Sequence, residues 1–296
     1  MFAHWILEIR PKTLFASIAP VILGISIAYK EQQLIHPLTA FLTLFCALLL
    51  QMATNIANDY LDSQKGIDTN QRLGPIRVTQ AGLIPPHKMK MALFTLLGLA
   101  FFLGSYLMWK GGTIIIIMGA LSLYFAYGYT GGPYPLSYNG LGEVAAFVFF
   151  GVIAVTGTNF LQTHSFSPLS VMMSFGPGFI SAAILAINNL RDTQTDKASH
   201  KRTLSVYFGE TFQRNLCLGF ILCSSLLIIG VSFYFQLYLL FPTALLPLLF
   251  MSHWRRIAYG PLDSNLNLSL AKTAQYLLLY CLMASIGILL SSESIT

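Results

Sequence analysis

Residues 38–68 read LTAFLTLFCALLLQMATNIANDYLDSQKGID, an apolar run that ends in a cluster of polar side chains. The run from 38 to 57 is long enough to cross the hydrocarbon of a membrane as a helix, which takes about 20 mostly apolar residues. Three of the eleven acidic residues, Asp59, Asp62 and Asp68, follow in a chain that is 55% hydrophobic and 9% charged. Carboxylates at a helix C-terminus face the negative end of the helix dipole, so their position calls for a functional explanation.

Further apolar runs make the chain a multi-pass membrane protein, because they leave too little polar surface for a soluble fold. We predict an all-α bundle of nine transmembrane helices forming a single domain over residues 1–296. One short run, 236–251, contains Pro242 and Pro247 and is expected to enter the membrane as a kinked helix. The spans are predicted near 14–29, 38–57, 89–108, 112–129, 141–161, 168–189, 215–234, 236–251 and 271–290.

The basic residues predict the orientation. With nine spans and a cytoplasmic N-terminus, every Lys and Arg except Lys30 and Lys110 lies on the cytoplasmic side, which is the side that such residues favour. The expected location is the cell inner membrane. The net charge of +6 then reflects the excess of Lys and Arg on the cytoplasmic side. We expect neither nucleic acid nor an obligate protein partner. The four cysteines lie within apolar spans and predict no disulfide or zinc site.

Two polar connections, 58–88 and 190–214, begin alike and then become basic. Four spans separate them, so both fall on the cytoplasmic side. The repeat predicts two related halves that meet at one active site. The paired patterns are Asn55-x-x-Asn58-Asp59-x-x-Asp62 and Asn188-Asn189-x-x-Asp192-x-x-x-Asp196.

Residues three and four apart share one face of a helix, where like charges repel. Three interpretations follow. The acids could be solvated helix ends, or part of an ion-transport path. They could instead hold Mg²⁺, which prefers oxygen ligands and bridges carboxylates to phosphates, while neighbouring Lys and Arg bind the phosphate oxygens. The third interpretation explains why each connection combines acids, amides and bases.

The segments NDYLD at 58–62 and DTQTD at 192–196 resemble the two Asp-rich motifs of the UbiA superfamily of intramembrane aromatic prenyltransferases. Gly66 stands where the first motif has a third acid, and Asp68 follows two residues later. With this departure, the first motif resembles that of one branch of the superfamily, the 1,4-dihydroxy-2-naphthoate polyprenyltransferases of menaquinone synthesis. Other segments resembling that branch are RLGPIRVTQAG at 72–82, RPKT at 10–13, GPYPLSY at 132–138, GLGE at 140–143, GT at 157–158, NNLRD at 188–192 and KRTL at 201–204.

The resemblance implies that a polyprenyl diphosphate and 1,4-dihydroxy-2-naphthoate give demethylmenaquinone, diphosphate and CO₂, with Mg²⁺ as the cofactor. The active site would face the cytoplasm, and the prenyl tail would pass sideways into membrane lipid. Two alternatives stay open: another aromatic acceptor, such as 4-hydroxybenzoate or homogentisate, and, from a different class, a cation transporter.

The resemblance also implies residue roles. Tyrosines near the prenyl cation could stabilise it, although each could equally be an interfacial belt residue. Glu143 could act on the acceptor or hold a loop. The expected metal ligands are Asn58, Asp59, Asp62, Asp68, Asp192 and Asp196. The expected diphosphate-binding residues are Asn58, Lys65, Arg72, Arg77, Lys197, Lys201 and Arg202. The expected acceptor-binding residues are Arg10, Lys12 and Glu143. The candidate tyrosines are Tyr124, Tyr127, Tyr129, Tyr134 and Tyr138, of which Tyr138 is favoured as catalytic, together with Asp59, Asp62, Asp192 and Asp196.

Overall fold

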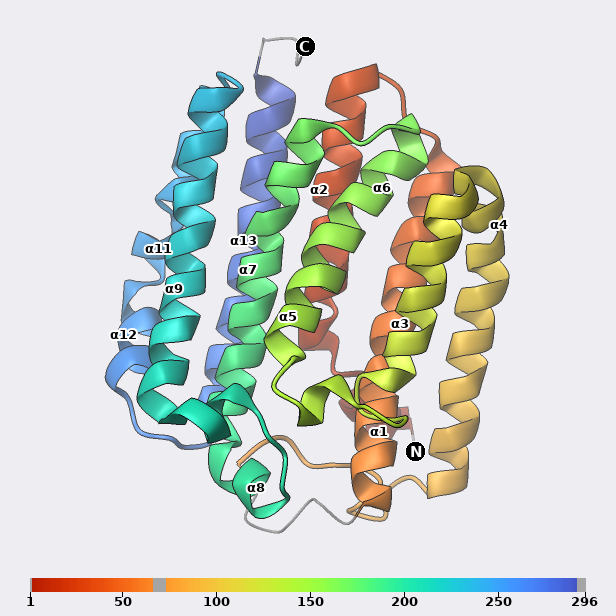
Figure 1. The fold of residues 1–296 in the computed structure, drawn as a ribbon, viewed down its shortest axis with the longest axis vertical. Helices are drawn as coiled ribbons and strands as arrows, with labels where there is room; N and C mark the ends of the chain where they lie inside the picture. The colour runs from red at the N-terminus through yellow and green to blue at the C-terminus, as the bar shows by residue number, and fades with distance from the viewer. Residues whose placement is uncertain (1, 66–72, 292–296) are drawn as a thin grey trace.

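The computed structural model describes residues 2–65 and 73–291, without the side chains of Phe2 and Lys12, and within these ranges it contains helices and no strand. The long helices run roughly parallel to one another in a single bundle (Figure 1). The main helices are α1 (Phe2–Ile9), α2 (Phe15–Gln32), α3 (Pro37–Gln64), α4 (Pro86–Gly128), α5 (Gly142–Phe147), α6 (Ala154–Thr163), α7 (Pro168–Arg191), α8 (Thr193–Ala198), α9 (Leu204–Tyr234), α10 (Phe241–Ala244), α11 (Leu246–Leu249), α12 (Met251–Tyr259) and α13 (Leu266–Leu290).

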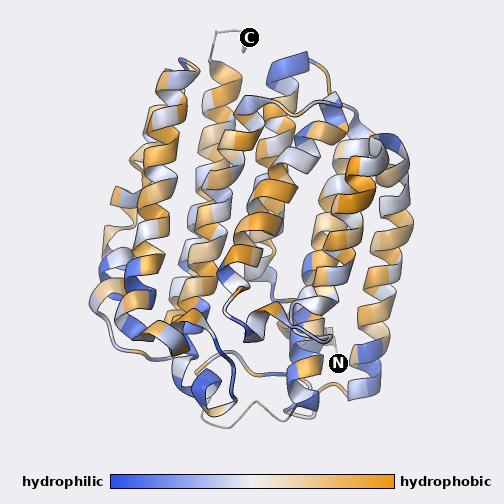
Figure 2. Cartoon of the chain, in the orientation of Figure 1, coloured by the Kyte–Doolittle hydropathy of each residue, from blue (hydrophilic) through white to orange (hydrophobic). Residues whose placement is uncertain are grey.

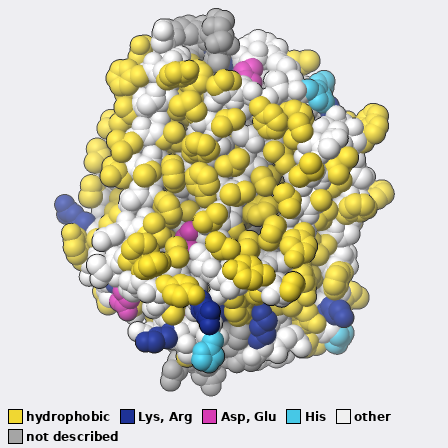
Figure 3. Space-filling model, in the orientation of Figure 1, with side chains coloured by type: hydrophobic (Ala, Val, Ile, Leu, Met, Phe, Trp, Pro, Cys, Tyr) yellow, Lys and Arg dark blue, Asp and Glu magenta, His cyan; other side chains and the backbone are white. Residues whose placement is uncertain are grey.

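Six helices in the described part of the chain are long and apolar enough to cross a membrane. They are α3, α4, the continuous α5–α6 unit, α7, α9 and α13. Figure 2 shows that their middle sections are hydrophobic and that hydrophilic residues gather toward the ends. On the face seen in Figure 3, hydrophobic side chains cover the middle, and most of the visible Lys and Arg lie toward the lower edge, with one further basic side chain at the left edge. This distribution is that of a multi-pass membrane protein.

Two predicted spans, 89–108 and 112–129, form the single element α4, which doubles back at Gly112. Gly112 has φ 64°, a left-handed conformation that glycine adopts without a steric penalty. The run 236–251, expected to be kinked, is divided further: α10 and α11 are one-turn helices with Pro242 and Pro247 near their starts. A proline in this position lacks the N–H that would continue a preceding helix.

Close backbone contacts hold α7 against the α5–α6 unit. A Cβ atom on Gly151, in the π-helical turn between α5 and α6, would lie 2.5 Å from the Cα of Gly178 on α7. Association in lipid depends on such close packing, since lipid is as apolar as the helix surfaces. The contact places the start of α5 beside the end of α7, where the second acidic motif lies.

The polar ends of the bundle meet on one side of the molecule. The lower ends of α3 and α7, the short helix α8 and the N-terminal helix α1 all lie at the lower end in Figure 1, and the C-terminus lies at the opposite end. One buried apolar cluster joins α2, α7, α9 and α13, and a smaller one joins α3 to α4 and to the loop residues Val78 and Ile84. The acidic motifs therefore lie at the same end of the bundle.

Candidate functional site

A cavity of about 700 Å³ opens between the two acidic motifs and extends into the bundle. Its polar end is lined by residues of both motifs, including Asn58 from α3 and Asp192 and Asp196 from the end of α7 and from α8. Deeper in the bundle the lining is mainly apolar, for example at Leu107 and Leu161. The cavity thus joins a charged mouth to an apolar interior, as an amphiphilic substrate requires.

Asp62 connects the end of the first motif to the segment that follows the second motif. Its carboxylate is fully buried and accepts hydrogen bonds from Arg77 Nη2 at 3.0 Å and from Lys201 Nζ at 2.9 Å. Tyr138 donates its hydroxyl to the other carboxylate oxygen at 2.8 Å. Lys201 follows the second motif, so this ion pair joins the end of α3 to the loop after α8. The two cations compensate the charge of the buried Asp62 carboxylate. Arg77 and Lys201 also line the cavity.

Asp59 has a different environment from the one predicted. It is fully buried, and its two oxygens accept hydrogen bonds from the backbone N–H groups of Val78 at 3.0 Å and Thr79 at 3.3 Å. Neither Asp59 nor Asp62 is among the described residues that line the cavity. In this structure Asp59 holds the loop that carries Arg77 against the end of α3.

Glu8 on α1 lies against Asp59 and was missed by the sequence interpretation. Burial, with the nearby Asp59 charge as the second cause, raises the pKa of Glu8 to about 9. The raised pKa favours the protonated form of Glu8. Glu8 belongs to no recognised motif, and the residue that it contacts, Asp59, lies far away in the sequence.

The second motif is organised by Arg191. Its guanidinium donates to Asp192 Oδ1 at 2.7 Å, to Asn188 at 2.8 Å and to Asn267 at 2.7 Å. Asn267 on α13 also donates to the Leu73 carbonyl at 2.8 Å. Arg191 lines the cavity, yet it was not among the predicted site residues. Its position next to Asp192 in the NNLRD segment is the signal that could have identified it.

Tyr138 lies beside the lysines rather than in the cavity lining. Lys65 Nζ is 3.9 Å and Lys201 Nζ 4.8 Å from its ring centroid, distances at which cations interact with aromatic rings. Burial and the Asp62 charge raise the pKa of Tyr138, so its hydroxyl remains a donor to Asp62. Among the five candidate tyrosines, the cavity lining contains Tyr129.

The residues predicted to bind the acceptor lie in different environments in the structure. Arg10 lines the mouth of the cavity. Glu143 is buried, and its Oε1 accepts from Asn189 at 2.9 Å and from Gln213 at 2.7 Å. It therefore holds Asn189, which lines the cavity, while Glu143 is not among the described lining residues.

The remaining predicted residues fall into three groups. Lys65 donates to the Thr130 carbonyl at 3.1 Å. Lys197 and Arg202 have exposed side chains and are not among the described lining residues. Asp68 and Arg72 lie outside the described residues, as does the side chain of Lys12.

The donor chemistry at the mouth fits a divalent cation. Carboxylates of Asp192 and Asp196 and amides of Asn58 and Asn188 line one opening, and these are the oxygen donors that Mg²⁺ prefers. Within the described residues, no three acidic, His or Cys side chains converge tightly enough to form a metal centre by themselves. The arrangement fits an ion held jointly by the protein and substrate phosphates, the common mode for Mg²⁺.

Comparisons with known proteins identify relatives of this chain. The chain is 38% identical over 232 residues to the 1,4-dihydroxy-2-naphthoate octaprenyltransferase of Escherichia coli (strain K12), covering 75% of each protein. It is 28% identical over 292 residues to the protein of the same name from Bacillus subtilis (strain 168), covering 95% of this chain and 91% of that one.

Solved structures share the fold. A UbiA homolog from Archaeoglobus fulgidus, solved bound to DMAPP and Mg²⁺, superposes with a TM-score of 0.67 at 14% identity, covering 97% of this chain and 99% of that one. The sequence profile of the UbiA prenyltransferase family matches residues 17–273. The chain therefore belongs to the UbiA prenyltransferase family.

Proposed function

We propose that this protein transfers a polyprenyl group from polyprenyl diphosphate to 1,4-dihydroxy-2-naphthoate, with release of diphosphate and CO₂. The observation that supports the proposal is the 2.9 Å ion pair between Asp62 and Lys201, which joins the end of the first motif to the segment after the second, beside a cavity that residues of both motifs line. The names of the relatives from Escherichia coli and Bacillus subtilis support the choice of acceptor. Family membership favours this reaction over cation transport.

The chemistry needs a stabilised leaving group and no protein nucleophile. Arg77, Arg191 and Lys201 line the mouth and would stabilise the charge that develops on the diphosphate. The C–O bond breaks with its electron pair on diphosphate, and the electron-rich ring carbon that bears the carboxylate forms the new C–C bond. The pair of the ring–carboxylate bond returns to the ring as CO₂ leaves. This balance gives the quinol form of demethylmenaquinone, since the quinone would require an oxidant.

We infer that Mg²⁺ is the cofactor and that Asn58, Asp62, Asp192 and Asp196 hold it, with Asp68 as a further predicted ligand. When bound, Mg²⁺ neutralises charge on the leaving diphosphate. The homolog solved with DMAPP and Mg²⁺ supports the use of a divalent ion by this fold. Asp59 is a further proposed ligand, and its hydrogen bonds from two backbone amides would also position the loop that carries Arg77.

We further infer nine spans with a cytoplasmic N-terminus and the active site on the cytoplasmic side of the inner membrane. The six long apolar helices become nine spans when α4 is divided at Gly112 and when α2 and the broken segment Tyr238–Leu249, which contains α10 and α11, are added. The distribution of Lys and Arg in the sequence supports this orientation. Residues 1–296 then form one domain with an apolar cavity that holds the prenyl tail and opens toward lipid.

The acceptor can be tested directly. Purified protein offered equal concentrations of 1,4-dihydroxy-2-naphthoate, 4-hydroxybenzoate and homogentisate with one polyprenyl diphosphate is expected to prefer the naphthoate by roughly 100-fold in kcat/KM, a discrimination within reach of a site that pairs its polar groups with substrate hydroxyls. Product formation is measured by liquid chromatography with mass spectrometry. A preference for either benzenoid acceptor would contradict the proposal.

A further inference from the structure

A buried glutamate joins three helices beside the second acidic motif. Glu143 Oε1, in the first turn of α5, accepts hydrogen bonds from Asn189 Nδ2 on α7 at 2.9 Å and from Gln213 Nε2 on α9 at 2.7 Å. Gln213 Nε2 also donates to the Ala186 carbonyl on α7 at 3.1 Å. All three side chains belong to residues that are more than nine-tenths buried. Burying polar groups among apolar helices is costly, and a cluster of them beside the cavity points to a role there.

The hydrogen bonds fix which end of the Asn189 amide faces the cavity. Glu143 Oε1 receives two N–H donors and therefore acts as an acceptor. The nitrogen of the Asn189 amide must then face Glu143, which leaves Oδ1 on the other side. Asn189 lines the cavity. Its Oδ1 accepts no hydrogen bond from the described residues and is not one of their covered unpaired atoms, so it is open to the cavity.

Glu143 and Gln213 do not reach the cavity themselves. Neither is among the described residues that line it. Their remaining oxygens, Glu143 Oε2 and Gln213 Oε1, are covered by protein atoms and have no hydrogen-bond partner in the described part of the chain. A covered oxygen cannot bind a ligand, so any effect of these two residues on the site passes through Asn189.

The open amide oxygen defines the chemistry of its ligand. It can bind a cation or a hydrogen-bond donor, but it repels phosphate oxygens, which are acceptors like itself. Asp192 follows Asn189 by three residues, and its backbone N–H still donates to the Asn188 carbonyl at 3.1 Å, as in a helix. Residues at this spacing share one face, with Cβ atoms about 5–6 Å apart. Beside a carboxylate, an oxygen that can only accept fits a divalent cation.

The neighbouring oxygens of the second motif are already engaged. Asn188 Oδ1 accepts from Arg191 Nη2 at 2.8 Å, and Asp192 Oδ1 accepts from Arg191 Nε at 2.7 Å. Both oxygens therefore face a cation of the protein. Asn189 Oδ1 has no such partner among the described residues, which leaves it available to an added cation.

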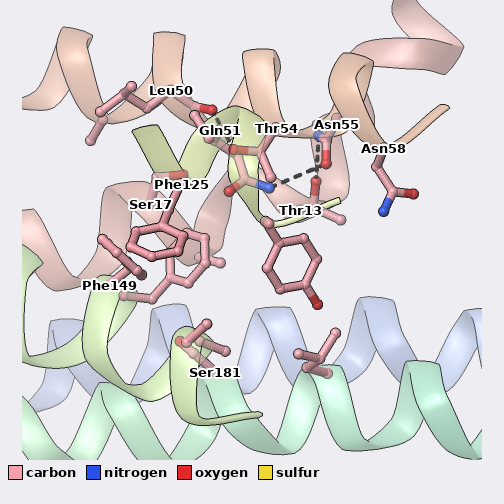
Figure 4. A pocket seen from close by; sticks show the side chains of 18 of the residues that line it. Thr13, Ser17, Leu50, Gln51, Thr54, Asn55, Asn58, Phe125, Phe149 and Ser181 are labelled. Atoms are coloured by element: carbon pink, nitrogen blue, oxygen red, sulfur yellow. Dashed lines mark hydrogen bonds between the residues drawn. The ribbon is translucent and has the colours of Figure 1, made fainter. Parts of the chain in front are cut away.

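The first motif has a matching arrangement. Asn58 Nδ2 donates to Thr130 Oγ1 at 3.1 Å, and Asn58 Oδ1 accepts no hydrogen bond from the described residues. Figure 4 shows the Asn58 side chain on α3, separate from the hydrogen bonds that Asn55 makes within the cavity lining. Asn58 lines the same cavity. Each motif therefore presents one amide oxygen whose nitrogen is held by the protein.

We propose that Glu143 and Gln213 are positioning residues that hold the Asn189 amide with its oxygen toward the cavity. That oxygen then serves as a ligand of the divalent cation that Asp192 and Asp196 are inferred to bind. This inference rests on the proposed function, because it adds a ligand to the cation site inferred there. Glu143 then acts on the cation site rather than on the acceptor.

Cation binding can be measured without prenyl transfer. Mn²⁺ is titrated into purified protein with inorganic diphosphate at the protein concentration, and free Mn²⁺ is followed by electron paramagnetic resonance. Asn189→Ala removes the ligand, and Gln213→Met leaves Glu143 free to turn away from Asn189. We expect each variant to bind Mn²⁺ about tenfold more weakly, the low end of the loss when a group that orients a metal ligand is removed. Glu143→Gln keeps an oxygen acceptor for both donors and should stay within about threefold of wild type.

A double-mutant cycle separates positioning from a general effect on the fold. With Asn189 already replaced by alanine, Gln213→Met should cause no further loss of Mn²⁺ affinity, because its effect passes through Asn189. Gln162→Met is the matched control. Gln162 is buried on α6, accepts from the backbone N–H of His36 at 2.8 Å and is not among the described lining residues. The control is expected to keep wild-type affinity.

Two results would overturn the inference while leaving the cation site intact. One is wild-type Mn²⁺ affinity in folded Asn189→Ala or Gln213→Met protein, and the other is an equal loss from Gln213→Met in both backgrounds of the cycle. If Gln213→Met does not fold, Gln213→Asn replaces it, because its shorter side chain cannot reach Glu143. Failure of the wild-type protein to bind Mn²⁺ would overturn the proposed cation site as well. No acceptor is present, so the result does not depend on which acceptor the protein prenylates.

Discussion

Replacing Asp62 by asparagine is expected to lower kcat by roughly three orders of magnitude, the scale of loss when a group that stabilises transition-state charge is removed. The substitution keeps the size of the side chain and one oxygen acceptor for Tyr138, but it removes the negative charge that Arg77 and Lys201 share. It also removes a proposed metal ligand at the point where the two motifs meet. The measurement is steady-state prenyl transfer by purified Asp62→Asn protein.

Stability has to be separated from catalysis in this variant. Breaking a buried ion pair by removing one partner costs about 3–5 kcal/mol, so the activity is measured well below the unfolding temperature of the variant. Asp263→Asn is the matched control, because Asp263 pairs with Arg256 at the surface, with about a third of its side chain exposed. The control is expected to stay within about twofold of wild type. A folded Asp62→Asn protein with wild-type kcat would contradict the role assigned to Asp62.

Removing divalent metal ions is expected to stop prenyl transfer. The leaving diphosphate carries several negative charges, and in the proposed site Arg77, Arg191 and Lys201 are already partly neutralised by Asp62 and Asp192. Without a further cation, ionisation of the allylic C–O bond lacks charge compensation. Treatment with EDTA should reduce the rate below detection, and excess Mg²⁺ should restore it.

The Asp62→Asn variant tests whether the metal acts at this site. Its residual activity should require a higher Mg²⁺ concentration for half-maximal rate than wild type, because one carboxylate ligand is missing. Metal content is verified by elemental analysis of each sample. Full activity in protein shown to be free of metal would rule out the metal-dependent mechanism.

Local patterns in the sequence identified the membrane helices and the acidic motifs. The apolar run before Asp62 and the spacing of Asp192 and Asp196 are visible without tertiary information, because helix periodicity places such residues on one face. The number and boundaries of the spans were harder to predict from the sequence. The predicted spans 89–108 and 112–129 form one element with a turn at Gly112, and a short segment near Pro242 is divided into single turns.

The contacts that organise the site depend on tertiary structure and could not be predicted. Glu8 acquires a role through Asp59, about fifty positions later in the chain, and nothing near Glu8 signals that contact. Tyr138 matched a family segment, yet its ring lies against Lys65 and Lys201.

The most direct measurement is a crystal structure with Mn²⁺ in place of Mg²⁺ and an unreactive thiolo-diphosphate analogue of the prenyl substrate. Anomalous scattering from Mn²⁺ locates the ions independently of the protein coordinates. We expect manganese within bonding distance of Asp62 and of Asp192 or Asp196, with the diphosphate between the two helix ends and beside Lys201. Manganese at only one helix end, or a diphosphate bound away from Asp62, would contradict the claim that both motifs serve one substrate.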